Sequence, residues 1–266
     1  MDMLERIDTL ASSESATVGV YFKRMDNGET IEYNASRVFP AASVIKVPIM
    51  MEVFNQESQG LFHFDDVLSV SEDTGGPRGS GILKYLKLPV DLSVWNLCTL
   101  MIIISDNTAS NRLIDLVGAD RVTRFCKTLG ASDIVLRRHF IGSGIDDISK
   151  DNTVTAKALG LILEKLYNRE IVSQRASEDM IGIMKKQQVN HKIPRYLPTD
   201  MAIAHKTGTQ DITSHDAGIV FNREGCDYIV CICCTGVPSH PNGDDIVAKI
   251  SRMLYEHSVD APRKEV

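Results

Sequence analysis

Residues 39–53 read FPAASVIKVPIMMEV, an apolar stretch that carries a serine and a lysine. From Val44 to Val53 apolar residues fall on almost every face of a helix, which predicts a helix enclosed by protein. Ser43 stands at its start, where free backbone N–H groups and the positive end of the helix dipole favour a developing negative charge. Lys46 follows one turn later on the same face, and burial lowers the pKa of a lysine. The stretch therefore predicts a serine nucleophile beside a lysine that can accept its proton.

Two further short motifs follow in the chain, at 105–107 (SDN) and 206–208 (KTG). Taken alone, the first is explained by helix capping and the second by a strand-to-turn junction with a surface lysine. A Ser-x-x-Lys pair alone is also expected by chance about once in a chain of this length. However, the SDN follows an apolar helix, and the KTG lies at the end of a predicted strand. The three motifs, in this order and context, therefore indicate a single site.

Strands are predicted near both ends of the chain and helices between them. Alternating and β-branched residues favour strands at 17–23, 30–34, 201–206, 217–221 and 228–235. Helical spacing predicts helices at 91–104, 108–117, 121–129, 155–167 and 244–256. The economical arrangement is an α/β (α+β) fold, with one antiparallel sheet and an inserted all-α lobe. We expect one catalytic domain over residues 1–266, with a sheet lobe (1–38 and 191–266), a helical lobe (39–190) and a cleft between them.

The composition is that of an ordinary globular protein, with 266 residues, 43% hydrophobic and 24% charged. A net charge of −6 argues against a nucleic-acid partner, and the longest apolar run, 100–104, is too short to span a membrane. Because residues 1–6 lack the parts of a signal peptide, we expect a cytoplasmic protein, or an exported one that has been trimmed. The six cysteines are then expected to be reduced and packed in the core. No metal or organic cofactor is expected, since neither a phosphate loop nor a metal-ligand cluster is visible.

The motifs and their neighbours resemble the class A β-lactamase family, and more broadly the penicillin-binding-protein-like transpeptidases. The resemblance extends from the N-terminal hairpin to the closing helix. It is carried by FPAAS at 39–43, GSGIL at 79–83, SDNTASN at 105–111, KTG at 206–208 and the late strand at 229–235. It implies a five-stranded antiparallel sheet flanked by the terminal helices. It also implies hydrolysis of a β-lactam, or of a related amide or ester, through an acyl-enzyme on Ser43.

The resemblance also implies roles for the site residues. Ser43 is the acylated nucleophile, Lys46 accepts its proton, and Ser105 passes a proton to the leaving nitrogen. The backbone N–H groups of Ser43 and Thr209 form the oxyanion hole, and Asn107 holds the substrate amide. The substrate carboxylate is held at the last motif, so that the expected substrate-binding residues are Asn107, Lys206, Thr207, Gly208 and Thr209.

One loop departs from the family pattern. In class A enzymes this loop opens with an arginine, carries a glutamate two residues later and closes with an aspartate, and the glutamate activates the water that releases the acyl group. Arg138 and Asp151 fit the two ends, but Phe140 stands at the glutamate position, and residues 137–151 contain no glutamate. The acyl-enzyme is therefore expected to form and persist unless another group activates water. The candidates are His139, Asp146 and Asp147, although a solvated or packing role in the loop is the favoured explanation for His139.

A second departure concerns the substrate carboxylate. In the family an arginine often begins the strand that is predicted here from Tyr228. A tyrosine cannot offer a bidentate guanidinium. His215, Arg223 and His240 are candidates to replace it.

Three interpretations of function follow. The first is a β-lactamase-type serine hydrolase. The second is an esterase, an amidase or a biosynthetic acyltransferase on the same fold, which would explain the altered loop. The third is a non-catalytic binding protein, which is disfavoured because a binder needs no nucleophile and proton relay. We expect a small-molecule substrate and a monomeric protein.

Overall fold

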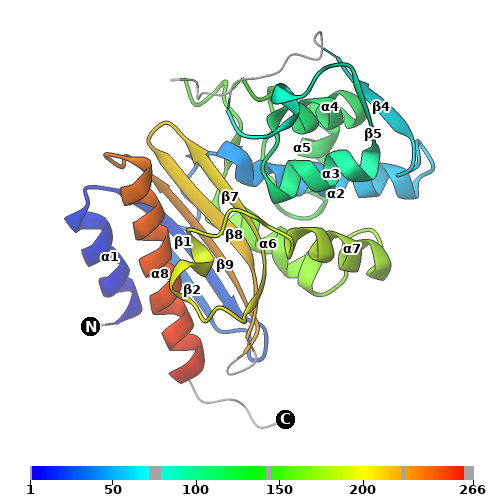
Figure 1. Ribbon diagram of the computed structural model, residues 1–266. Coiled ribbons are helices and arrows are strands. Elements are labelled where there is room, and N and C mark those ends of the chain that lie inside the picture. Colours follow the sequence, from blue (N-terminus) through cyan, green and yellow to red (C-terminus); the bar gives the residue numbers. More distant parts are fainter. Residues whose placement is uncertain (1, 72–78, 142–144, 146, 223–225, 261–266) are drawn as a thin grey trace.

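The computed structural model describes residues 2–71, 79–141, 145, 147–222 and 226–260. The fold is mixed α/β, as predicted, with its largest sheet built from the two ends of the chain (Figure 1). Its strand order is β2-β1-β9-β8-β7, and every neighbouring pair is antiparallel. The strands are β1 (Thr17–Arg24), β2 (Thr30–Tyr33), β7 (Ala202–Gln210), β8 (Thr213–Phe221) and β9 (Tyr228–Thr235).

Both faces of this sheet are buried, and alternate residues of a strand enter different hydrophobic cores. In β9, Cys231 and Cys233 belong to one core, whereas Val230 and Ile232 belong to the other. The period-2 alternation of a strand sends neighbouring side chains to opposite faces, so a strand covered on both sides is apolar throughout. All six cysteines are buried and free, as expected from the sequence.

The terminal helices α1 (Met3–Ser13) and α8 (His240–Asp260) cover one face of the sheet (Figure 1). Helix α1 begins with a capping box, in which Asp2 and Glu5 satisfy each other's backbone N–H groups, and it buries Ile7 and Ala11. The buried face of α8 includes Ile246, Ile250 and Leu254, and it packs on β8 and β9. Helical spacing at the end of the chain thus predicted the correct contact face, although the helix is longer than 244–256.

The remaining helices lie on the opposite side of the sheet, around the larger core (Figure 1). They are α2 (Lys46–Ser58), α3 (Val94–Ile103), α4 (Asn107–Val117), α5 (Ala119–Thr128), α6 (Ala156–Tyr167) and α7 (Gln174–Met184). Short 3-10 helices lie at η1 (Ala42–Ile45), η3 (Leu83–Tyr85) and η4 (Ile193–Tyr196). Two small antiparallel pairs complete the fold: β3 (Phe39–Pro40) with β6 (Thr153–Val154), and β4 (Val67–Val70) with β5 (Val90–Ser93). None of the described helices combines the length and apolar character needed to cross a membrane.

Several element boundaries differ from the sequence expectation, and strand pairing explains two of them. The helix predicted from residue 91 begins at Val94, because residues 90–93 pair with β4 and Ser93 caps the helix through the N–H of Asn96. The strand predicted to end at the KTG motif instead continues to Gln210, opposite Thr213. The motif therefore lies within β7, the last strand in the order of the sheet.

Candidate active site

Ser43 lies in η1, which runs directly into α2, and its exposed fraction is only 9%. Strand β7 passes immediately beside it. A Cβ built on Gly208 would lie 3.2 Å from the backbone nitrogen of Ser43 and 3.2 Å from the Cβ of Ala42. Glycine is therefore the residue that lets this strand approach the backbone of the serine so closely.

Lys46 joins the first motif to the second. Its Nζ lies 2.8 Å from the backbone oxygen of Ser105, 3.0 Å from Ser105 Oγ and 2.7 Å from Asn107 Oδ1. The side chain is fully buried, and this burial holds the pKa of Lys46 well below its ordinary value. The charge of Lys206 lowers that pKa further, whereas Asp106 opposes the shift. The arrangement places a lysine that can be neutral within reach of a serine hydroxyl.

The loop that carries Ser105 is held in an unusual backbone conformation. Ser105 has a φ of 57°, in the left-handed region that most residues avoid. The neighbouring Asp106 anchors the loop, because its carboxylate accepts the N–H groups of Ile82 at 2.7 Å, Leu83 at 2.9 Å and Ala109 at 3.0 Å. These three bonds hold the loop in the position that brings Ser105 to Lys46.

The third motif supplies a second buried cation. Lys206 is fully buried, and its Nζ donates to the backbone oxygen of Thr207 at 2.7 Å. Burial lowers the pKa of Lys206 to about 7, Asp216 opposes this change, and Lys192 adds to it. Lys206 therefore changes charge near neutral pH.

Lys192 is a residue that the sequence reasoning missed. It immediately precedes η4, is fully buried, and donates to Gly208 O at 2.7 Å and Thr209 Oγ1 at 2.8 Å. No periodic pattern marks this lysine in the sequence. Only the path of the chain across the sheet brings it to the KTG strand.

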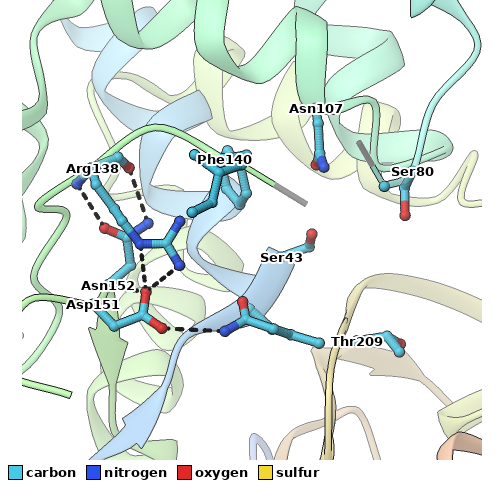
Figure 2. Close-up of a pocket in the computed structure, with 12 residues that line it drawn as sticks. Ser43, Ser80, Asn107, Arg138, Phe140, Asp151, Asn152 and Thr209 are labelled. Carbon is cyan, nitrogen blue, oxygen red and sulfur yellow. Dashed lines mark hydrogen bonds and ion pairs between the residues drawn. The ribbon is translucent and has the colours of Figure 1, made fainter. Parts of the chain in front are cut away.

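A pocket lies where the segments that carry the three motifs meet (Figure 2). Ser43 and Asn107 line it together with Thr209, from the start of η1, the start of α4 and the edge strand β7. Among the described residues, its lining is Ala42, Ser43, Gly79, Ser80, Asn107, Arg138, Phe140, Ile141, Asp151, Asn152, Thr209 and Gln210.

Phe140 occupies the side of the pocket where the sequence comparison leads one to expect a glutamate. Its ring centroid lies 4.3 Å from Lys46 Nζ, a cation–π geometry, and Figure 2 shows the ring pointing into the pocket. Its backbone is held at both ends by Asn111, which accepts from Phe140 N at 2.8 Å and donates to Phe140 O at 2.9 Å. The aromatic ring is thus a fixed wall of the site beside the lysine.

Asp151 is the carboxylate in the described lining of the pocket, and its oxygens are already engaged. Oδ1 pairs with Arg138 through Nη2 at 2.7 Å and Nε at 2.9 Å, and it also accepts Asn152 N at 2.7 Å. Oδ2 accepts from Gln210 at 3.2 Å and from Ile145 N at 3.3 Å. Asp151 therefore braces the loop that carries Phe140.

Of the three candidates for water activation, the two that the structure describes do not line this pocket. His139 Nε2 lies 2.7 Å from Asp115 Oδ1, and the side chain is 48% exposed. Asp147 accepts hydrogen bonds from the backbone and hydroxyl of Ser149. Neither residue belongs to the described lining. Asp146 lies outside the described residues.

Tyr228, the position compared with the family's arginine, begins β9 as predicted but lies away from the KTG motif. Tyr228 lies opposite Val220, which in turn lies opposite Ile203, so it is three positions along the sheet from Lys206. Its ring packs against Phe22 in the core beneath α8, at a centroid distance of 5.2 Å. The strand that follows the KTG motif is β8, and a residue of β9 reaches the motif only across it.

Of the three residues proposed to replace an arginine, the structure describes His215 and His240. His215 is buried and accepts the N–H of Cys234 at Nδ1, so its Nε2–H donates to Pro40 O at 2.8 Å. Burial lowers the pKa of His215 to about 4, which keeps it neutral. His240 is exposed at the start of α8, and Arg223 lies outside the described residues. The buried cations that do adjoin the motif are Lys192 and Lys206.

Comparison with known proteins identifies the family. A family model described as the β-lactamase enzyme family matches residues 3–258. A β-lactamase of Streptomyces lavendulae is 26% identical over 260 residues, which cover 95% of this chain and 85% of that protein.

Solved structures agree in fold over nearly the whole chain. The β-lactamase of Sphaerobacter thermophilus matches with a TM-score of 0.92 at 28% identity, covering 98% of this chain and 100% of that one. PBP-A matches with a TM-score of 0.87 at 30% identity, covering 96% of this chain and 95% of that one. A mutant of PBP-A has been solved as an acyl-enzyme complex with penicillin G. This chain therefore belongs to the β-lactamase enzyme family, as a serine hydrolase.

Proposed function

We propose that the protein is acylated on Ser43 by a β-lactam, or by a related amide or ester, and releases the acyl group slowly. The observation that carries this proposal is the position of Phe140. Its ring lies 4.3 Å from Lys46 Nζ in a pocket that Ser43 also lines. A buried lysine supports attack by the serine, whereas a phenyl ring can neither accept a proton from water nor orient it.

The acylation half of the reaction follows from the contacts of Lys46. Neutral Lys46 takes the proton of Ser43 as Oγ attacks the substrate carbonyl. Ser105 Oγ, 3.0 Å from Lys46 Nζ, relays that proton to the leaving nitrogen as the carbon–nitrogen bond breaks. The N–H groups of Ser43 and Thr209 stabilise the oxyanion, at about 3 kcal/mol per donor. Asn107 and Lys206 hold the substrate amide and carboxylate, and Thr207 and Gly208 complete the strand beside them.

Water activation is the half for which the described pocket offers no free base. Asp151 is the carboxylate in the described lining, and Arg138 and Gln210 occupy its oxygens. His139 faces Asp115 instead. The finding that a mutant of PBP-A holds penicillin G as an acyl-enzyme is consistent with β-lactam acylation on this fold. The described lining of the pocket joins several distant segments of this chain, and we also propose that the protein acts as a monomer.

The experiment is to mix the protein with benzylpenicillin and to follow its intact mass over time, with Ser43→Ala as the control. We expect an adduct that requires Ser43 and decays slowly. Peptide mapping would separate Ser43 from Ser80, a second serine that lines the pocket. Rapid loss of the drug without a persistent adduct would contradict slow release. An intact drug with unmodified protein would contradict the β-lactam substrate.

Phe140 also favours a second candidate, in which the acyl group passes to an amine instead of water. Such an acyltransferase needs an acyl-enzyme that water attacks poorly, which is the condition that an apolar wall creates. Adding an amine such as hydroxylamine to the preformed adduct would discriminate between the two. Faster loss of the adduct, with a hydroxamate as product, supports acyl transfer, and an unchanged lifetime supports slow hydrolysis.

A further inference from the structure

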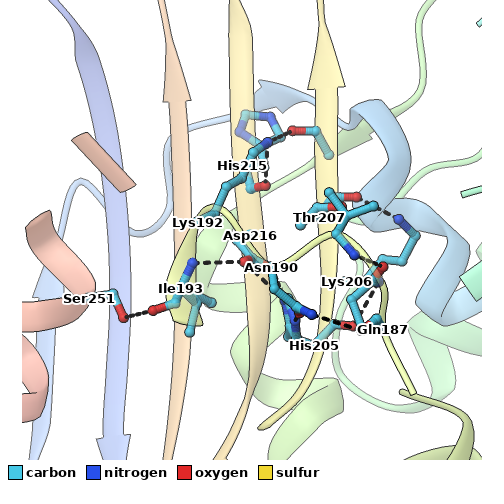
Figure 3. Close-up of polar contacts among 12 residues, drawn as sticks. Gln187, Asn190, Lys192, Ile193, His205, Lys206, Thr207, His215, Asp216 and Ser251 are labelled. Carbon is cyan, nitrogen blue, oxygen red and sulfur yellow. Dashed lines mark hydrogen bonds and ion pairs between the residues drawn. The ribbon is translucent and has the colours of Figure 1, made fainter. Parts of the chain in front are cut away.

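Lys192 donates hydrogen bonds to both residues of the peptide group between Gly208 and Thr209. Its Nζ donates to Gly208 O at 2.7 Å, Thr209 Oγ1 at 2.8 Å and His215 O at 3.2 Å. It also lies 3.3 Å from Asp244 Oδ1 at the start of α8. Figure 3 shows the lysine reaching across the sheet from the turn that precedes Ile193.

The carbonyl that Lys192 holds and the N–H of Thr209 belong to the same peptide unit. Resonance couples the two groups, so a cation at the oxygen withdraws electron density from the nitrogen and makes its N–H a stronger donor. In a trans peptide the two groups point in opposite directions. Gly208 O faces Lys192 and β8, and the Thr209 N–H therefore points to the outer edge of β7, the last strand in the order of the sheet.

We infer that Lys192 is a positioning residue that orients and polarises the Gly208–Thr209 peptide, and so strengthens the Thr209 N–H as an oxyanion donor. This inference rests on the proposed function, in which that N–H stabilises the transition state of acylation. The charge-assisted bond to Gly208 O and the bond to Thr209 Oγ1 hold both residues of this peptide group. A preorganised donor of this kind needs no rearrangement during the reaction.

The surroundings of Lys192 favour this role over direct contact with substrate. Lys192 is fully buried and is absent from the described pocket lining, whereas Thr209 belongs to it. Its counter-ion Asp244 is itself held by Ser214 Oγ at 2.7 Å and by His191 at 3.1 Å. The charge of Lys192 is therefore anchored behind the strand and acts on the pocket through the peptide.

The test measures acylation and the strength of the oxyanion hole separately. Acylation rates are compared for benzylpenicillin and for p-nitrophenyl acetate, which lacks a carboxylate. Infrared difference spectra then give the stretching frequency of the acyl-ester carbonyl on Ser43, which falls as oxyanion-hole hydrogen bonds strengthen. The variants are Lys192→Met, Lys192→Arg and Asp244→Asn.

We expect Lys192→Met to slow acylation about tenfold with both compounds and to raise the carbonyl frequency. The Thr209 N–H would be weakened and not lost, so the rate should fall by less than when an oxyanion-hole donor is removed. Lys192→Arg retains a cationic donor and should recover part of the frequency shift. Asp244→Asn removes the ion pair but leaves the donors of Lys192 in place, so it should lower the melting temperature without moving the frequency.

If Lys192→Met fails to fold because Asp244 is left buried and unpaired, the double variant Lys192→Met/Asp244→Asn is compared with Asp244→Asn alone. A carbonyl frequency that does not move in the variants lacking Lys192 overturns the inference. So does slowing with benzylpenicillin alone, because that result assigns Lys192 to the substrate carboxylate. If the wild-type protein forms no acyl-enzyme with either compound, the proposed function fails and this inference fails with it.

Discussion

Replacing Phe140 with glutamate should turn a slowly released acyl-enzyme into one that turns over. The backbone of Phe140 is held by two hydrogen bonds from Asn111, so a new side chain starts from the same Cα and points to the same part of the pocket. The phenyl ring it replaces lies 4.3 Å from Lys46 Nζ, which also donates to Asn107 Oδ1 at 2.7 Å. A carboxylate at that place would lie next to both the lysine and a water that approaches the acyl group.

The magnitude follows from this geometry. At 4.3 Å from Lys46, the attraction between a carboxylate and an ammonium is about 4 kcal/mol at an effective dielectric constant of about 20. That attraction offsets much of the cost of desolvating the carboxylate, which is several kcal/mol. It also raises the pKa of Lys46, so the variant holds an ionised glutamate beside a protonated lysine where the wild-type lysine is neutral. A positioned general base contributes roughly 100- to 10,000-fold, and we expect the lifetime of the acyl-enzyme to shorten by a factor in that range. Loss of the buried ring should lower the free energy of unfolding by up to about 3 kcal/mol.

The assay is the decay of the benzylpenicillin adduct on Ser43, followed by intact mass after unreacted drug is removed. Phe140→Gln is the matched control, because glutamine has the shape of glutamate without its basicity. Equal lifetimes for the glutamate and glutamine variants would refute the reasoning, since a base would then not be what the site lacks. A wild-type adduct that already decays within seconds would refute it as well.

Three other predictions test the motif residues and the core. The rate of acylation by a carboxylate-bearing β-lactam should fall as the pH rises through about 7, because the pKa of Lys206 lies there and its ammonium is lost. Lys206→Arg keeps the positive charge, so the pH profile of its acylation rate should lack this alkaline decline. Gly81→Ala should slow acylation more than about tenfold, because the new Cβ would meet Asp106 Oδ2 at 2.3 Å; Gly130→Ala shares the positive φ but meets nothing within 4 Å, so it should lower only the melting temperature. The free energy of unfolding should fall by up to about 3 kcal/mol as the pH drops from 6.5 to 4. In this range His215 gains a proton in the unfolded protein but not in the folded one, where its pKa is about 4. Urea titrations at several pH values should show that the unfolding free energy of His215→Gln lacks this part of the pH dependence.

Much of this protein follows from local pattern in the sequence. The apolar residues of α2 predict a buried helix, and α2 buries ten side chains that include Lys46. Alternation along β9 predicts a strand, and helical spacing near the end of the chain predicts α8. These features depend on the periods of 2 and 3.6 residues, which a sequence displays directly. The three motifs are legible for the same reason, since each lies within a few residues of one element boundary.

These periods do not show which helix or strand packs against each element. Lys46 and Ser105 are 59 residues apart, and the helix-start pattern of neither predicts the 3.0 Å contact between Nζ and Oγ. From the sequence we predict that β7 ends at the KTG motif, whereas in the structure Gln210 still pairs with Thr213. Hydrogen bonds to a neighbouring strand outweigh the local turn preference of glycine.

Only the tertiary structure determined which residues lie around the catalytic motifs. It placed Tyr228 away from the KTG motif, because β8 lies between β9 and that motif. It placed Phe140 over Lys46 and put Lys192 behind the peptide of Thr209. A local pattern reports which face of an element is buried, whereas the partner of that face is selected by packing and hydrogen bonding between segments distant in the chain.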